Sequence, residues 1–199
     1  VKDGETLSLG DRELTFYETK MLHWPDSMFS YLNEERVLFS QDAFGMHLST
    51  SERFADEIPD EILNDEGARY FANILLPYAP RIEKLMEKVT AIGLAPEVIA
   101  PDHGPIWRDD LVRVTDAYLR WSAQKPTKKA VVVYDTMWES TEKMALAVGE
   151  GLRKGGAQPK IMPLKSFHRS DIAGELLDAG ALIVGSPTLN NNMFPTVAA

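Results

Sequence analysis

Residues 130–145 read AVVVYDTMWESTEKMA, and this stretch decides the fold of the second part of the chain. An apolar run without alternation predicts a strand that is buried on both faces, as in a parallel sheet. The hydroxyl-rich segment after it opens a helix over 140–154. A strand over 157–162, a helix over 169–179 and a second buried strand, ALIVGS at 181–186, follow. This βαβαβ order is typical of a doubly wound parallel sheet.

The composition changes just before this stretch. Residues 124–129, QKPTKK, are polar, basic and contain a proline, which is typical of an interdomain linker. We therefore predict one domain over residues 1–123, a linker over 124–129 and a second domain over 130–199.

The first domain is predicted to mix strands and helices. Apolar and polar residues alternate over 5–9 and 13–18 around the turn at Gly10, which predicts a hairpin. Residues 52–64 are acidic and are read as irregular, and Gly93 is the expected cap of the second helix. The remaining expected elements are short strands at 37–40 and 96–100 and amphipathic helices at 65–77, 80–92 and 109–123.

The composition restricts the class of protein. The chain has 199 residues, 44% of them hydrophobic, with no cysteine and a formal net charge of −9. The absence of cysteine excludes disulfides, thiolate metal sites and cysteine nucleophiles within this stretch. The acidic charge disfavours nucleic acid and anionic lipid as partners, and no apolar run reaches the roughly 18 residues of a membrane helix. We expect a cytoplasmic protein that binds neither nucleic acid nor a membrane.

Histidine and aspartate follow the strand-like runs of the first domain. His23 follows LTFYETKML, His47 follows VLFSQDAFG, His103 follows EVIAPD, and Asp42 stands just after VLFS. Loops at strand ends are where ligands and catalytic groups gather, and imidazole with carboxylate suits zinc, iron or manganese. Each residue taken alone also fits an ordinary role, such as a packed loop histidine or an Asx-turn aspartate. Their grouping favours a metal site, although spacing alone leaves both readings open.

The segments MLHWPDSM, SQDAFGMH and APDHGPIW resemble, in this order, the metallo-β-lactamase-like domain of flavodiiron proteins. The separations, 19 residues from His23 to Asp42 and 61 from Asp42 to His103, are similar to those of the family. The resemblance implies that His23 binds one iron, Asp42 bridges both irons and His103 binds the other. His47 matches a family histidine beside the irons, and we assign it a catalytic role there.

The resemblance also implies that part of the iron site lies outside this sequence. The other ligands of the family lie in an HxExDH segment, and this chain contains none. The chain opens in a strand-like segment without an initiator methionine, so we expect a fragment that carries half of a dimetal site. As a fragment it is expected to be inactive, with one weakly bound metal or none.

The loop YDTMWEST after the strand at 130–135 can cradle a phosphate. Its hydroxyl groups and the N–H groups of the helix start supply donors, and the GxxxxGK[ST] motif of nucleoside triphosphate sites is absent. The alternative is an ordinary Ser/Thr helix cap. The loop GSPTLNNNMFP follows the strand at 181–186 and belongs at the same edge of the sheet, where flavodoxin-like sheets bind ligands.

These two loops resemble those of the flavodoxin domain of the same family, which implies bound FMN. Glu139 and Asn192 depart from the glycines expected there, and a third flavin loop is expected after Ala199. His168 is read as a surface residue. The positions that match the phosphate loop are Thr136, Met137, Trp138, Ser140 and Thr141, and those that match the loop beside the isoalloxazine are Pro187, Thr188, Leu189 and Asn190.

Membership of this family implies an oxidoreductase that passes electrons from FMN to two non-haem irons. The irons would reduce dioxygen to water, nitric oxide to nitrous oxide, or both. A rubredoxin-like protein would donate the electrons, and flavin and iron would meet across a head-to-tail homodimer. Two alternatives stay open: a metal-dependent hydrolase of the metallo-β-lactamase class fused to a flavodoxin-like module, and a flavin electron carrier without catalysis.

Overall fold

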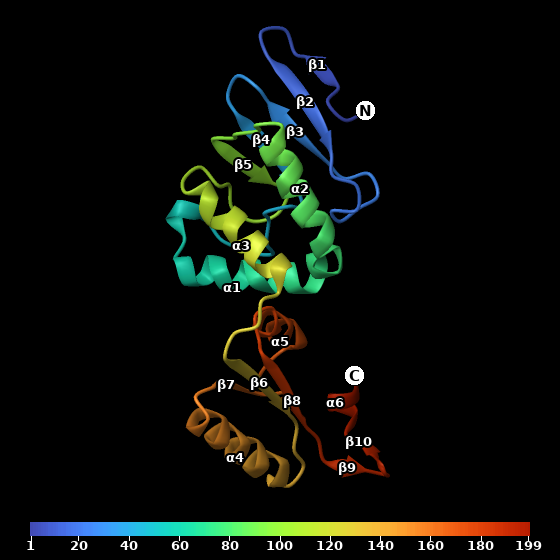
Figure 1. Ribbon diagram of the computed structural model, residues 1–199, viewed down its shortest axis with the longest axis vertical. Helices are drawn as coiled ribbons and strands as arrows, with labels where there is room; N and C mark the ends of the chain where they lie inside the picture. Colours follow the sequence, from blue (N-terminus) through green and yellow to red (C-terminus); the bar gives the residue numbers. More distant parts are fainter. The chain divides into compact units, whose positions relative to one another are not determined.

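The computed structural model describes residues 1–199, and the chain forms two compact units, Val1–Ala123 and Gln124–Ala199 (Figure 1). Each unit combines a sheet with helices, which confirms the α/β fold class.

The first unit is built on a five-stranded sheet in the order β1-β2-β3-β4-β5. The first four strands are antiparallel, whereas β5 runs parallel to β4. The predicted hairpin is confirmed, while β3 was missed because its five residues MFSYL form too short a pattern to separate from the loop before them. The strands are β1 (Thr6–Ser8), β2 (Glu13–Glu18), β3 (Met28–Leu32), β4 (Val37–Gln41) and β5 (Val98–Pro101).

The helices of the first unit begin and end differently from the prediction. Residues 52–64 are not irregular throughout, because a 3₁₀ turn spans Ala55–Glu57 (η1) and helix α1 spans Asp60–Tyr70. Pro59 precedes α1 and acidic residues fill its first turn, where the positive end of the helix dipole stabilises them. A π turn at Phe71–Leu75 (η2) and a 3₁₀ turn at Leu76–Tyr78 (η3) replace the end of the predicted helix. Helices α2 (Ala79–Ala91) and α3 (Leu111–Ala123) follow.

Aromatic rings form much of the core of the first unit. Phe44 lies 4.8 Å from the Tyr118 ring and 6.2 Å from Phe29, measured between ring centroids. Phe71 contacts both Tyr118 and Trp121, at 5.2 and 5.4 Å. These rings join β3, the loop after β4, the π turn and α3, so the loop after β4 rests on a rigid base.

The second unit is a parallel three-stranded sheet in the order β7-β6-β8. The buried strand predicted at 130–135 is observed one residue earlier, over Lys129–Tyr134, as the central strand of the sheet. The helix predicted at 140–154 is observed over the same residues. The elements are β6 (Lys129–Tyr134), α4 (Ser140–Lys154), β7 (Gln158–Pro163), α5 (Arg169–Leu176), β8 (Ala181–Gly185), a small hairpin of β9 (Thr188–Leu189) and β10 (Asn192–Met193), and the short α6 (Pro195–Ala198).

Strand β8 is not buried on both faces, contrary to the prediction. Leu182 and Val184 are 50% and 53% exposed. They pair with Val131 and Val133 of β6, which are covered by Met162 and Ile172. Strand β8 lies at the edge of the sheet. Helix α5 covers residues of the neighbouring strand β6 but leaves Leu182 and Val184 of β8 exposed.

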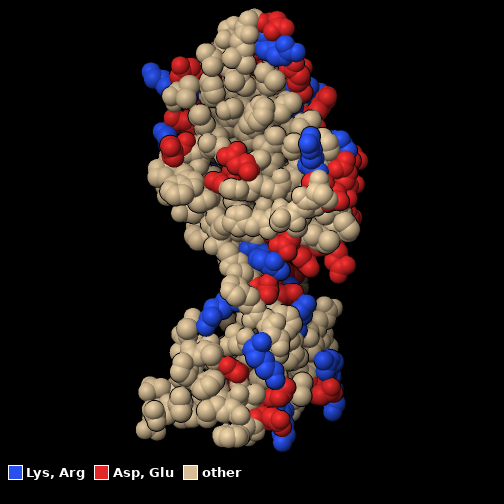
Figure 2. Space-filling view, turned by 180° about the vertical axis from the view of Figure 1, so that it is seen from behind, with Lys and Arg blue, Asp and Glu red and all other residues tan.

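Charged side chains of both signs are interspersed on the face shown in Figure 2, in each of the two units. No helix of the structure is long and apolar enough to span a bilayer.

Candidate functional site

The structure brings His23, Asp42 and His103 together from three separate loops of the first unit. Nε2 of His23 lies 3.4 Å from Oδ2 of Asp42, and Nε2 of His103 lies 3.3 Å from Oδ1 of the same carboxylate. Asp42 is 8% exposed, so its two oxygens are directed at the two imidazoles rather than at solvent. The carboxylate therefore stands between the two rings and offers one oxygen to each.

The His23 loop is closed by its own backbone. At its base the Thr19 N–H donates to the Ser27 carbonyl at 3.0 Å, and the Met21 N–H donates to the Trp24 carbonyl at 2.7 Å. The Ser27 hydroxyl accepts from the Trp24 N–H at 3.0 Å. This self-contained loop presents the His23 ring, which packs against the exposed Trp24 ring with 5.4 Å between centroids.

The loops that carry Asp42 and His103 are joined directly. The Met46 N–H donates to the His103 carbonyl at 3.2 Å. A Cβ atom on Gly45 would lie 2.8 Å from that carbonyl oxygen, and one on Gly104, whose φ is +82°, would lie 2.8 Å from Met46. Only glycine permits this approach, so the separation of Asp42 from His103 is set by close backbone packing.

Two buried side chains hold the loop between Asp42 and His47. The Phe44 N–H donates to the Tyr118 hydroxyl at 2.7 Å, and the Phe44 carbonyl accepts from Trp107 Nε1 at 2.9 Å. Phe44 has a φ of +66°, a conformation that non-glycine residues adopt only when the surroundings impose it. The Tyr118 and Trp107 bonds are the surroundings that impose it, and we call this arrangement the Phe44 clamp.

His47 and Tyr70 lie beside the carboxylate. The His47 ring meets the Tyr70 ring edge-on at 4.9 Å and the His103 ring at 5.3 Å between centroids. The Tyr70 hydroxyl donates to Oδ1 of Asp42 over a long 3.5 Å. Burial, together with the charge of Asp42, raises the pKa of Tyr70 well above its usual value. Tyr70 therefore keeps its proton at neutral pH and can serve as a neutral donor toward Asp42.

Tyr70 was missed by sequence reasoning. It sits at the end of an amphipathic helix, where a buried tyrosine looks like any core residue. Its position on the site follows only from the packing of α1 against the Asp42 loop.

The donor set fits half of a dinuclear site. No group of three or more histidine or acidic side chains surrounds a single centre. What the structure offers instead is two pairs, His23 with Asp42 and His103 with Asp42, that share one carboxylate. This matches a carboxylate that bridges two ions, with one imidazole for each. Two ligands for each ion would leave such a site incomplete without further ligands.

The loop after β6 lies next to the end of β8, as expected for parallel strands. The Asp135 N–H donates to the Gly185 carbonyl at 3.2 Å, and a Cβ on Gly185 would lie 2.9 Å from the Thr141 methyl group. The Thr136 hydroxyl is buried without a hydrogen-bond partner, and Thr141 is 5% exposed. A buried, unpaired hydroxyl beside a helix start is the environment that a phosphate oxygen would satisfy.

Glu139 occupies the position where a glycine is expected, and its φ of +61° explains that expectation. The left-handed conformation favours glycine, and glutamate adopts it here at the N-cap of α4. The side chains of Met137 and Trp138 are exposed, Trp138 by 82%.

The second loop forms the β9–β10 hairpin. Asn190 and Asn191 occupy its turn with φ values of +50° and +61°, the pattern of a type I′ turn, for which asparagine is well suited. The Ser186 hydroxyl accepts from the Phe194 N–H at 2.8 Å and thereby closes the loop. The hairpin presents the exposed segment from Thr188 to Asn190 at the edge reached by the loop after β6.

His168 is exposed, and its ring accepts from the Ser170 N–H at 3.2 Å as the N-cap of α5. It takes no part in either group of candidate residues.

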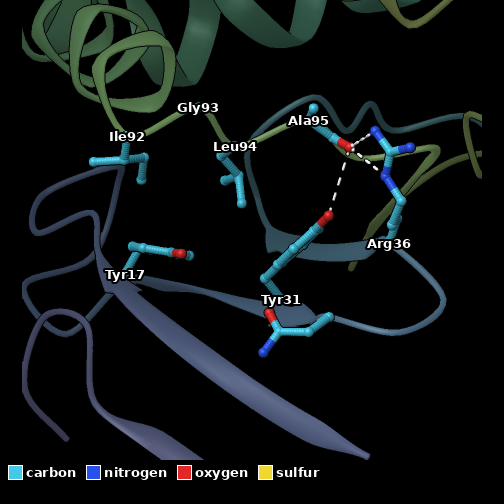
Figure 3. A pocket seen from close by; sticks show the side chains of 8 residues that line it. Tyr17, Tyr31, Arg36, Ile92, Gly93, Leu94 and Ala95 are labelled. Atoms are coloured by element: carbon cyan, nitrogen blue, oxygen red, sulfur yellow. Dashed lines mark hydrogen bonds between the residues drawn. The ribbon is translucent and has the colours of Figure 1, made fainter.

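A further hollow of about 370 Å³ lies between β2, β3 and the segment from Ile92 to Ala95 (Figure 3). Tyr17, Tyr31 and Leu94 face it. The Arg36 guanidinium at its rim is occupied by the Ala95 carbonyl and by Glu97. It contains none of the candidate ligands.

Comparison with known proteins identifies both units. The ODP family of beta-lactamase-like proteins matches residues 1–104, and the flavodoxin family matches residues 132–198. The chain belongs to the flavodiiron proteins, and the two family matches fall on its first and its second unit in turn.

Individual relatives agree with this assignment. A rubredoxin-oxygen oxidoreductase from Megalodesulfovibrio gigas is 52% identical over the whole of this chain, and a nitric oxide reductase from Moorella thermoacetica is 50% identical. The solved rubredoxin oxygen:oxidoreductase from Desulfovibrio gigas superposes with a TM-score of 0.95, and the flavodiiron protein from Giardia intestinalis, 39% identical, with 0.93. The chain spans about half the length of these proteins, 50% of the first three and 48% of the last.

Proposed function

We propose that this chain is part of an oxidoreductase that passes electrons from FMN to a non-haem di-iron site, where dioxygen is reduced to water, nitric oxide to nitrous oxide, or both. The observation that carries the proposal is the Asp42 carboxylate, which offers one oxygen to His23 and the other to His103. The similarity to a rubredoxin-oxygen oxidoreductase and to a nitric oxide reductase supports both substrates.

In this proposal His23 and Asp42 would hold one iron, and His103 and Asp42 would hold the other. When bound, the irons would supply the redox chemistry. The chain itself fixes the separation of the two ligand pairs through the Phe44 clamp and the close packing at Gly45 and Gly104.

Reduction of dioxygen to water consumes protons, and so does reduction of nitric oxide to nitrous oxide and water. Tyr70 holds a proton at its hydroxyl beside Asp42, and His47 is exposed and can exchange protons with solvent. The edge-on contact of His47 with Tyr70 puts the two groups in sequence from solvent to site. We assign His47 the catalytic role of proton transfer.

FMN would bind at the carboxyl edge of the second unit. Its phosphate would lie on the N–H groups and hydroxyls of residues 136–141, and its ring beside residues 187–190. Support comes from the unpaired Thr136 hydroxyl and from the flavodoxin match. A rubredoxin-like donor, a head-to-tail homodimer and a cytoplasmic location complete the proposal.

The test uses the complete protein with Asp42→Asn and with Asp26→Asn as control. Asparagine keeps the shape of Asp42 but cannot bridge two cations, whereas Asp26 is an exposed residue of the His23 loop. Iron content, flavin absorbance and consumption of dioxygen and nitric oxide with a reduced rubredoxin are measured. We expect Asp42→Asn to lose iron and at least about tenfold in turnover while flavin stays bound.

Two results would contradict the proposal. Full iron content in Asp42→Asn would remove the bridging role. Hydrolysis of a lactam or thioester by the unaltered protein, without consumption of dioxygen or nitric oxide, would favour a hydrolase, and flavin reduction without either turnover would favour an electron carrier.

A further inference from the structure

A hollow of about 200 Å³ lies between the end of β2, the start of the His23 loop and helix α2. Its floor includes the apolar side chains of Leu22 and Leu85, both buried. Glu18, Thr19 and four basic residues line the rest, and we call it the basic hollow. The basic residues are Lys20, Arg81, Lys84 and Lys88. The chain has a net charge of −9, so four basic side chains around one hollow are a local departure from its acidic composition.

Nearby carboxylates neutralise only two of these cations. Lys88 pairs with Asp3, and Lys20 pairs with Glu18 at 3.0 Å. Arg81 and Lys84 form no ion pair within the chain, although α2 also carries Glu83 and Glu87. The hollow therefore holds an excess of positive charge.

The spacing of the cations on α2 works against helix stability. Arg81, Lys84 and Lys88 stand three and four residues apart, so they share one face of the helix. Like charges at these spacings repel each other, and a sequence chosen for stability alone would alternate the signs. A local conflict of this kind is expected where a residue is kept for binding.

Thr19 provides a second, independent observation. It lines the hollow, is 6% exposed, and its hydroxyl makes no hydrogen bond within the chain. Its position is fixed, because its N–H donates to Ser27 and its carbonyl accepts from the Leu22 N–H at 2.9 Å. A hydroxyl that lines the hollow on a backbone fixed in this way, and that makes no hydrogen bond within the chain, can donate to a ligand oxygen.

We propose that the basic hollow binds the phosphate group of a small organic phosphate monoester. Lys84, Arg81 and the Thr19 hydroxyl would contact the phosphate oxygens. The hollow is larger than a single phosphate, and Leu22 and Leu85 offer an apolar surface to a short organic remainder. The proposal requires neither iron nor FMN, and so it stands or falls separately from the proposed function.

The test is an NMR titration of the full chain with inorganic phosphate and with phenyl phosphate, at an ionic strength held constant with sodium chloride. We expect saturable shifts of the backbone amides of residues 19–22 and 81–88, with tighter binding of phenyl phosphate. Lys84→Gln should weaken binding about tenfold, the loss of one charge-assisted hydrogen bond. Thr19→Val, which keeps the shape and removes the donor, should weaken it by roughly fivefold.

Lys165→Gln is the matched control, since Lys165 is an exposed lysine of the second unit. It should leave the affinity unchanged, and Lys84→Arg should restore it. Shifts that chloride reproduces at equal ionic strength would overturn the proposal. So would unchanged affinity in both Lys84→Gln and Arg81→Gln, or a response to a glutamate peptide with none to phosphate.

Discussion

The Phe44 clamp shows how single residues set the geometry of the candidate metal site. Tyr118 is buried, and its hydroxyl accepts the Phe44 N–H two residues after Asp42. Tyr118→Phe would leave that N–H buried without a partner, which costs about 1–3 kcal/mol. We expect a less stable first unit and weaker binding of iron in the complete protein, measured by denaturant unfolding and by competition with a chelator.

Tyr78→Phe serves as the control for this prediction, since Tyr78 is half-buried and its hydroxyl makes no hydrogen bond within the chain. Denaturant unfolding reports the stability of the first unit, and chelator competition reports whether Asp42 is still positioned to bind iron. If Tyr118→Phe lowers stability but leaves the iron affinity unchanged, the clamp does not position Asp42.

The hydroxyls of the loop after β6 are expected to determine FMN affinity. Thr141→Val keeps the shape of a nearly buried side chain and removes one donor, as Thr136→Val does. A hydrogen bond to a charged phosphate contributes about 1.5–3 kcal/mol, so each variant of the complete protein should bind FMN roughly tenfold to a hundredfold more weakly. Fluorescence quenching measures the affinity. No change in either variant would mean that the loop is only a helix cap.

Glu139→Gly should have the opposite effect in the same loop. Glycine adopts the observed φ of +61° without strain, and the substitution removes a negative charge near the proposed phosphate. We expect FMN affinity that is unchanged or higher, and thermal stability of the second unit that is at least equal. A marked loss of affinity would show that the carboxylate itself contributes to the site.

At the scale of elements, close packing between the two ligand loops depends on Gly104. Gly104→Ala combines a strained backbone with a Cβ 2.8 Å from Met46, whereas Gly4, with a φ of +76°, has nothing within 4 Å. Gly4→Ala should therefore cost only the backbone strain, about 1–2 kcal/mol. Gly104→Ala should cost a further 1–3 kcal/mol or so from overpacking. Equal effects of the two substitutions on unfolding would contradict the packing argument.

Strands β6 and β7 are tied to α5 by a charge network. Lys129 and Lys160 both pair with Glu175, at 3.1 and 2.9 Å. Burial alone would raise the pKa of Glu175, but the bonds from Lys160 and Lys129 outweigh it and hold the pKa below its usual value. Because the pKa of Glu175 is lower in the folded protein than in the unfolded chain, where it is about 4.5, the ionised carboxylate stabilises the folded state. This stabilisation is complete above the pKa of the unfolded chain and is lost as the pH falls through the pKa of the folded protein.

Glu175→Gln should therefore destabilise the second unit at pH 7 and make its stability less dependent on pH in the acid range. The network is partly exposed, so the expected effect at pH 7 is about 1 kcal/mol. Urea unfolding at pH 7 and pH 3 measures both quantities, with the exposed Glu150→Gln as the control. An unchanged slope of stability against pH would contradict the assignment.

At the scale of the whole molecule, the division into two units predicts where a protease cuts. Thr127 already bonds to the Asp178 carbonyl and Lys129 opens β6, so the segment without such bonds is Gln124 to Pro126. Limited digestion with a protease of broad specificity should cut there first and release two fragments. First cleavage within 130–185 would contradict two independently packed units.

The local pattern of the sequence determined the hairpin, helix α4, the central strand β6 and the meeting of two loops at one sheet edge. These features depend on neighbours in the chain, since a continuous apolar run fixes a buried strand and parallel strands end at the same edge. The order of MLHWPDSM, SQDAFGMH and APDHGPIW along the chain likewise indicated the candidate ligands.

Only the tertiary structure decided how these ligands meet. The sharing of Asp42 between two imidazoles, the place of Tyr70 and the Phe44 clamp join residues far apart in sequence, as with Phe44 and Tyr118. Strand β3 and the exposed face of β8 also escaped prediction, because burial depends on what packs against an element and not on its own composition. Sequence thus specified which groups were available, and packing specified their distances.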